Sequence, residues 1–180
     1  YKRQVKKVAA AAMAMAVVFG AASLKPVAAN AAQAGPETAS VMEEENSFLN
    51  HQDEAYQNEF LRRVNSERAK AGLKPLVMGD AKLTAAAQHR AEEIATVNSH
   101  VRPNGSKWYT VLSEYGVTDA ASGENAAWGS VSPEEVVTAW MNSEGHRANI
   151  LDPEARAMGV GYYYNSSSTW GHQWIQLFTK

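Results

Sequence analysis

Apolar residues recur at helical spacing from residue 56 onward. The first such stretch places five of them on one face: Tyr56, Phe60, Leu61, Val64 and Ala71. Gly72 and Pro75 predict where this helix ends. Asp80 is suited to cap a second helix, which we expect to end near Asn98. Four apolar residues share one face of the second helix: Leu83, Ala87, Ala91 and Ile94. Its charged residues are expected mostly on the opposite face: Arg90, Glu92 and Glu93.

Capping and turn residues predict two further helices. Residues 108–115 form a short one that Gly116 closes. Ser132 begins the next, because Pro133 then stands at the first helical position and Glu135 completes a capping box. The apolar face of this helix comprises Val136, Val137, Trp140 and Met141.

Beyond Pro153 the apolar period changes from that of a helix to that of a strand. Residues 158–164 and 169–178 flank a polar turn at residues 165–168, which predicts a β-hairpin. The second strand directs Trp174 and Phe178 to one face and Ile175 and Leu177 to the other. Both faces of the sheet must therefore be covered, and helices on both sides predict an α/β/α sandwich.

The first fifty residues have a different pattern. A basic start with Lys2, Arg3, Lys6 and Lys7 precedes an apolar stretch at residues 8–22. This layout predicts a secretory signal over residues 1–34. A membrane anchor is the alternative, but it needs about 20 continuous apolar residues, and this run is shorter and ends at Lys25 and Pro26. We expect an acidic flexible linker at residues 35–54, a folded domain at residues 55–180, and secretion without stable membrane insertion after cleavage.

Charge and cysteine content exclude several classes of function. Cleavage removes five of the 17 basic residues and none of the 19 acidic ones, which leaves a net charge of about −7. An acidic domain without a basic stripe is repelled by phosphate backbones, so we expect no nucleic-acid partner. The chain has no cysteine, which excludes thiolate metal sites and cysteine nucleophiles.

The common signatures of hydrolases and nucleotide enzymes are absent from the sequence. What remains is a set of polar residues near the expected boundaries of helices and strands: His100, Glu124, Glu144 and His146.

These residues lie in five short motifs that occur in a specific order. The motifs are Asn65-Ser66-Glu67-Arg68, Ser99-His100, Gly123-Glu124-Asn125, Trp140 to Leu151, and Gly159-Val160-Gly161. In this order they resemble the CAP superfamily, which includes cysteine-rich secretory proteins, antigen 5, plant pathogenesis-related 1 proteins and bacterial SCP-domain proteins. The resemblance covers residues 56–180. It implies a three-layer α/β/α sandwich of the α+β class with a central antiparallel sheet, and a cleft with two histidines and two acidic residues.

Carried over position by position, the histidines are His100 and His146 and the first acid is Glu124. Glu144 is the equivalent of the second acid through the spacing Trp-x-x-Ser-Glu, which resembles that of plant-type members. Two neutral imidazoles suit Zn²⁺ or a similar divalent ion, with water and a carboxylate completing the coordination. The alternatives are that the acids orient the rings, or that the four groups form a hydrogen-bonded network without metal.

The other polar and aromatic candidates are given structural roles. We expect His172 to be packed on its strand, and His51 and His89 to be solvated. Asn125 and Arg147 are expected to stabilise loops. The residues Tyr162 to Tyr164 are expected in the core rather than in a groove for a peptide, glycan or lipid.

Three hypotheses for function follow. The leading one is a secreted CAP-domain module that binds an extracellular peptide, glycan or lipid, or an envelope protein, with no catalytic residue assigned. The second is a metal-assisted or carboxylate-dependent extracellular hydrolase that uses Glu124 and Glu144 as acid and base. The third is a structural adaptor whose acidic linker spaces the domain from another surface.

Overall fold

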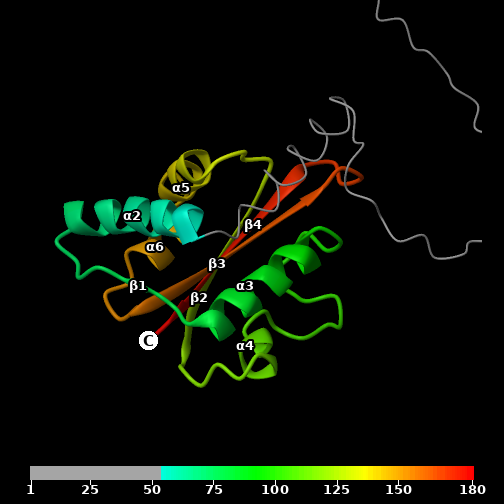
Figure 1. Cartoon of the computed structure of the whole chain (residues 1–180), viewed down its shortest axis with the longest axis horizontal. Coiled ribbons are helices and arrows are strands. Elements are labelled where there is room, and N and C mark those ends of the chain that lie inside the picture. The colour runs from blue at the N-terminus through cyan, green and yellow to red at the C-terminus, as the bar shows by residue number, and fades with distance from the viewer. Residues whose placement is uncertain (1–53) are drawn as a thin grey trace, which may run out of the picture. The chain divides into compact units, whose positions relative to one another are not determined.

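The computed structural model describes residues 54–180 (Figure 1). The predicted signal at residues 1–34 and almost all of the predicted linker at residues 35–54 lie outside the described residues. In chain order the elements are α2 (Glu54–Lys70), β1 (Val77–Met78), α3 (Ala81–Ile94), α4 (Thr110–Glu114), β2 (Ala121–Trp128), α5 (Pro133–Met141), α6 (Glu144–Ile150), β3 (Ala157–Asn165) and β4 (Gly171–Thr179). No helix among residues 54–180 combines the length and the apolar character needed to cross a membrane.

The four strands form one sheet in the order β1-β3-β4-β2. The predicted hairpin is present as β3 and β4, which pair antiparallel from Ala157↔Thr179 to Asn165↔Gly171. β2 pairs antiparallel with the other edge of β4. β1 pairs with β3 in parallel at one edge of the sheet, whereas the longer strands β3, β4 and β2 are antiparallel as expected. A two-residue strand is too short to show an alternating pattern, so no local pattern predicts β1.

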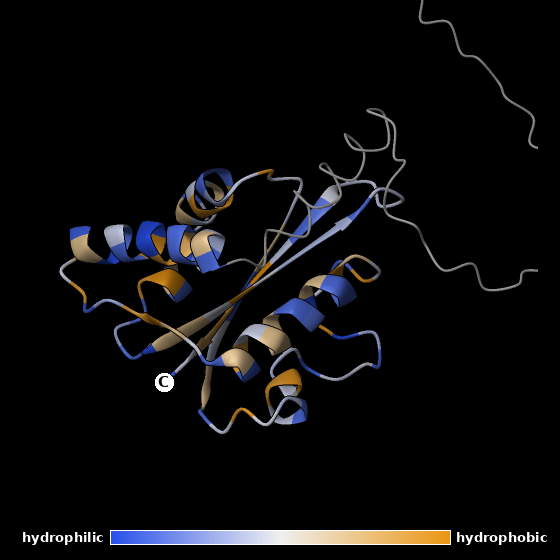
Figure 2. Cartoon of the chain, viewed as in Figure 1, coloured by the Kyte–Doolittle hydropathy of each residue, from blue (hydrophilic) through white to orange (hydrophobic). Residues whose placement is uncertain are grey.

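Helices cover both faces of the sheet, as the alternation along β4 predicts. Figure 1 shows α2, α5 and α6 on one side of the strands and α3 and α4 on the other. Trp174 and Phe178 lie in the core beneath α2 and α5, whereas Ile175 and Leu177 lie in the core beneath α3. Figure 2 shows the ends of β3 and β4 next to their turn as hydrophilic. The architecture is therefore the expected α/β/α sandwich.

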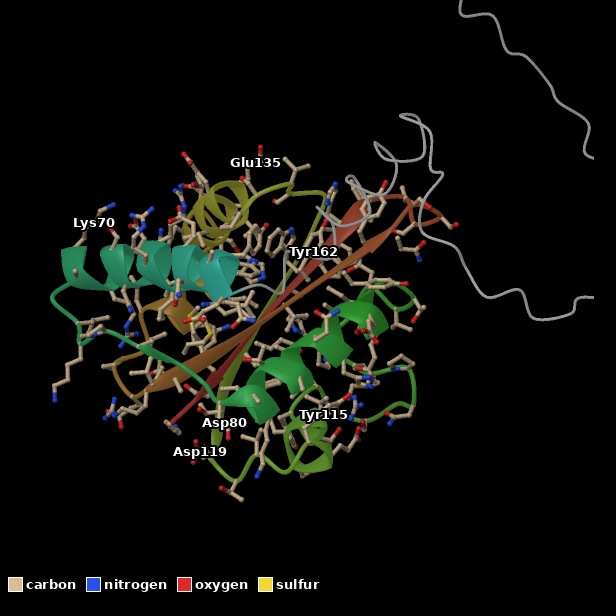
Figure 3. All side chains as sticks on the ribbon, in the orientation of Figure 1. Lys70, Asp80, Tyr115, Asp119, Glu135 and Tyr162 are labelled. Atoms are coloured by element: carbon tan, nitrogen blue, oxygen red, sulfur yellow. The ribbon has the colours of Figure 1, made fainter. Side chains whose placement is uncertain are left out.

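The predicted starts of α3 and α5 are confirmed, whereas the short helix predicted at residues 108–115 is α4, which begins at Thr110. Oδ1 of Asp80, labelled at the start of α3 in Figure 3, accepts hydrogen bonds from the backbone N–H groups of Lys82 and Leu83, each at 3.0 Å. Oγ of Ser132 accepts from the N–H of Glu135 at 3.2 Å, and Glu135 accepts in return from the N–H of Val131. In the usual capping box the glutamate accepts from the N–H of the cap residue itself, whereas Glu135 accepts from the residue before it.

α3 ends at Ile94, four residues before the expected Asn98. Two side chains donate hydrogen bonds to backbone carbonyls of its last turn. Trp128 donates to the carbonyl of Ile94, and Thr96 donates to that of Glu93. Local hydrogen bonds of this kind compete with the continuation of a helix.

α3 packs unusually close to β3, and two glycines of β3 make this possible. A Cβ atom on Gly159 would lie 2.6 Å from the carbonyl oxygen of Leu83, and one on Gly161 would overlap the carbonyl oxygen of Ala87. The Gly-Val-Gly motif therefore lets the helix backbone lie directly on the strand. This contact fixes the position of α3, which carries Arg90 toward the candidate site.

Candidate functional site

Glu124 lies in the middle of β2 and is buried. The expectation that it stands at an element boundary is wrong, because the sequence did not reveal this strand. β2 reads Ala-Ser-Gly-Glu-Asn-Ala-Ala-Trp, with small and polar residues that favour strands weakly, and its central residues are buried on both faces. A central strand of this kind shows no alternation of apolar and polar positions.

A buried guanidinium and an exposed imidazole share the carboxylate of Glu124. Nε of Arg90 donates to Oε2 at 2.9 Å and Nη2 of Arg90 donates to Oε1 at 3.1 Å. Nδ1 of His100 lies 2.7 Å from the same Oε1. The side chains of Arg90 and Glu124 have no exposed surface, whereas that of His100 is 56% exposed. His100 is thus a surface ring fixed from below by a buried ion pair.

This arrangement favours the protonated form of His100. The hydrogen bond to Glu124 raises the pKa of His100 above its usual range, and the negative charge of Glu124 adds to the effect. Partial burial and the positive charge of Arg90 oppose the increase in pKa without cancelling it.

His146 lies in α6, and its ring centroid is 6.4 Å from that of Trp140. Burial is the main cause that lowers the pKa of His146, and the positive charge of His100 lowers it further. The geometry joins His100 to Glu124 through their 2.7 Å contact, and it places the backbone of His146 against the strand that carries Glu124, because Asn125 donates to the carbonyl of His146.

The backbone around His146 is fixed to β2 by two amide side chains. Nδ2 of Asn125 donates to the carbonyl of His146 at 3.1 Å. Nδ2 of Asn149 donates to the carbonyl of Glu124 at 3.2 Å and to Oδ1 of Asn125 at 2.9 Å. A Cβ atom on Gly123 would lie 2.8 Å from Oδ1 of Asn149. Asn125 therefore has the structural role expected from the sequence, since it holds α6 against the strand that carries Glu124.

Glu144 is the first residue of α6 and is exposed. Among residues 54–180, no hydrogen bond or ion pair joins Glu144 to His100, Glu124 or His146. The described part of the chain also contains no group of three or more His, Cys, Asp or Glu side chains placed to hold a metal ion. Any metal at this site would therefore rest on the two imidazoles and water.

The site does not coincide with the hollow along α3. That hollow has a volume of about 590 Å³, and its lining includes Gln57, Thr84, Gln88, His89 and Tyr115. None of His100, Glu124, Glu144 and His146 contributes to its wall.

Sequence reasoning missed Arg90, which was expected mostly on the exposed face of its helix and is fully buried instead. Its position was visible in the spacing, because Arg90 lies seven residues after Leu83 and three after Ala87, on the apolar face of α3. The burial of a charged residue on that face is rare without a partner. Glu124, 34 residues further along the chain, is that partner.

His172 has the packed role expected of it, whereas His89 is only partly exposed and contacts Glu93 rather than being fully solvated. His172 on β4 is held by a 2.7 Å hydrogen bond between its Nδ1 and the hydroxyl of Tyr162. Nε2 of His89 on α3 lies 3.3 Å from a carboxylate oxygen of Glu93, and its side chain is 38% exposed. His51 lies outside the described residues.

Comparison with known proteins identifies the family. The profile described as CAP, the cysteine-rich secretory protein family, matches residues 61–178. The chain belongs to this family. The CAP match contains every residue of the candidate site, although this chain has no cysteine.

The CAP relatives include bacterial proteins of greater length. The chain is 41% identical over 123 residues to an uncharacterized protein, YkwD, of Bacillus subtilis (strain 168). The matched stretch covers 67% of this chain and 47% of YkwD. The chain thus spans about half the length of this relative. An extracellular protein of Bacillus anthracis str. Ames that contains an SCP domain has a TM-score of 0.60 and 25% identity, over 68% of this chain and 39% of that one. An outer surface protein of Borrelia burgdorferi shares the fold, with a TM-score of 0.60 at 20% identity over 69% of this chain and 91% of its own.

Proposed function

We propose that this chain is an extracytoplasmic CAP-domain module that binds a divalent cation and an extracellular partner at the surface formed by His100 and His146. The signal-like pattern of residues 1–34 supports export, as do relatives described as an extracellular protein and an outer surface protein. The partner on this proposal is a peptide, a glycan, a lipid or an envelope protein.

One observation carries the proposal: an exposed imidazole is held by a carboxylate that is itself completely buried and paired. Nδ1 of His100 is engaged by Glu124, so Nε2 is the ring nitrogen left to meet a ligand. Burial of the pair between Arg90 and Glu124 has a desolvation cost that an ordinary surface histidine would not require. A ring oriented in this way is organised for binding before a ligand arrives.

The donor set fits a weak cation site. His100 and His146 would supply two nitrogen ligands, and water would complete the coordination. Glu124 would act by orienting His100, which is the usual role of a carboxylate hydrogen-bonded to a ligating imidazole. A bound divalent cation would add positive charge at the surface and would favour partners with anionic groups.

The hydrolase hypothesis has less support than binding. It needs Glu124 and Glu144 as acid and base beside the histidines, yet both oxygens of Glu124 are engaged and its side chain has no exposed surface. A general acid or base must come within hydrogen-bond reach of the proton it transfers. The adaptor hypothesis concerns residues 35–54, almost all of which lie outside the described residues.

Calorimetric titration of the tag-free protein with ZnCl₂ tests the proposal. We expect saturable binding by the wild type and its loss in the His100→Ala/His146→Ala double variant. His172→Ala is the matched control, because it removes an imidazole of the same domain that is bonded to Tyr162 and lies outside the site, and it should bind like the wild type. Equal binding heats for the wild type and the double variant would overturn the proposal.

A further inference from the structure

The pair of Arg90 and Glu124 belongs to a longer chain of alternating charges. In order, its members are Glu114, Arg102, Glu93, Arg90, Glu124 and His100. The four central side chains are between 0% and 12% exposed, whereas the two ends, Glu114 and His100, are about half exposed. We name these six residues the ion-pair chain. It connects α4, the loop that carries His100, α3 and β2.

We propose that the ion-pair chain is a positioning device for His100, with Arg90 as its main positioning residue. Arg90 fixes the carboxylate of Glu124, and one oxygen of that carboxylate then accepts a hydrogen bond from Nδ1 of His100. The other ring nitrogen of His100, Nε2, faces solvent on this proposal. The functional meaning of this orientation rests on the proposed function, whereas the orientation itself does not.

Every nitrogen of the Arg90 guanidinium has a partner that contributes to this geometry. Nε and Nη2 donate to the two oxygens of Glu124, and Nη1 donates to Glu93 at 2.6 Å. Nη2 also donates to the carbonyl of Ser99 at 3.2 Å, directly before His100. Arg90 therefore fixes both the backbone at His100 and the carboxylate that holds its ring. A lysine, which is a single point charge, cannot make these contacts at once.

Arg102 fixes the loop on the other side of His100. Its Nη2 donates to Glu93 at 2.8 Å, and its Nη1 donates to Glu114 and to Thr110. The carbonyl of His100 also accepts from the N–H of Trp108 at 3.1 Å. Glu93 on α3 thus accepts hydrogen bonds from both arginines. Because Arg90 contacts the backbone before His100 and Arg102 follows it, the loop is fixed on both sides of His100.

The charges of the buried part cancel, since two carboxylates alternate with two guanidinium groups. Buried ion pairs of this kind are often no more stabilising than apolar residues of the same size. A gain in stability is therefore a weak explanation for the presence of four buried charged side chains, the last of which contacts the exposed ring of His100. Fixing the tautomer of that imidazole is a use that apolar residues could not serve.

Long-range ¹H–¹⁵N spectra of the histidine rings test the proposal in the metal-free protein. At a pH where the rings are neutral, we expect wild-type His100 to carry its proton on Nδ1. In Arg90→Lys and in Glu93→Gln, loss of the fixed acceptor should release the ring to exchange between both tautomers. Glu134→Gln is the matched control, because it breaks the 2.9 Å ion pair between α2 and α5 that Glu134 makes with Arg63, far from His100 in the sequence. It should leave the His100 signals unchanged.

A second readout is the zinc affinity of the same variants. We expect the zinc Kd to rise by roughly 10–100-fold in Arg90→Lys, as for other groups that orient a ligating histidine. If wild-type protein binds no zinc but the tautomer changes in the variants, the proposed function fails and the positioning role stands. The positioning role is overturned if His100 carries its proton on Nε2 in the wild type, or if the folded variants keep the wild-type tautomer. Glu93→Gln keeps this test decisive if Arg90→Lys does not fold.

Discussion

Two imidazoles of the same site have opposite shifts in pKa, and this difference follows from what each ring touches. His100 gains a buried carboxylate partner, which raises its pKa above the ordinary value of 6.5. His146 is partly buried and is repelled by the positive charge of His100, and both effects lower its pKa below 6.5. At a pH near 6.5 the site therefore favours one charged and one neutral ring.

A histidine titration followed by NMR checks this assignment. We expect the midpoint of His100 above 6.5 and that of His146 below it. Glu124→Gln should move the midpoint of His100 downward, because it removes the charge and the acceptor that favour the protonated ring. The account is contradicted if His100 titrates below His146, or if Glu124→Gln leaves both midpoints in place.

The same shifts set the direction of the pH dependence of stability. The raised pKa of His100 gives a stabilising contribution that is fully present below its unfolded pKa and is lost as pH rises through its folded pKa. The lowered pKa of His146 acts in the opposite sense, with a contribution that is present above its unfolded pKa and is lost as pH falls through its folded pKa. His100→Ala should therefore reduce the free energy of unfolding more at pH 5.5 than at pH 8, as measured by urea denaturation at the two pH values.

The close contact between α3 and β3 determines where Arg90 meets Glu124. Gly161→Ala would place a methyl group against the backbone of Ala87 and force the helix away from the strand. Because overpacking of this kind typically costs about 1–3 kcal/mol, we expect a loss in that range in the free energy of unfolding. Gly145→Ala is the comparison, because nothing lies within 4 Å of its added methyl group. Alanine in a helix is favoured over glycine by about 1 kcal/mol, so Gly145→Ala should be neutral or stabilising. An unchanged stability for Gly161→Ala would show that this contact does not fix the helix.

Elements with strong local signals could be predicted from the sequence. Asp80 and Ser132 cap helices where their spacing indicated, and the polar residues 165–168 separate the strands of the hairpin. β1 and β2 could not be predicted, because β1 has two residues and β2 is built of small and polar residues buried on both faces. The end of α3 depends on a hydrogen bond from Trp128, which no local pattern reveals.

The assembled domain explains which site residues were predictable. His100, Glu124 and His146 came from motifs shared with the CAP family; the sandwich joins His100 to Glu124 and holds the backbone of His146 against β2. Glu144 was predicted from its resemblance to the Trp-x-x-Ser-Glu spacing of plant-type members, and it lies at the exposed start of α6. The spacing of Arg90 on α3 indicated its buried position, but its pairing with Glu124 and the burial of Arg102 depend on carboxylates brought near by the fold, which spacing does not show.

On the proposed function, His100 and His146 face one shared binding position on the surface of the domain. An anomalous difference map tests this, from crystals of the tag-free protein grown with ZnCl₂ and recorded at the zinc absorption edge. We expect a peak within coordination distance of both Nε2 of His100 and a ring nitrogen of His146, with Nδ1 of His100 still bonded to Glu124. A map with no peak between these two rings, or with zinc bound only at other side chains, would contradict it.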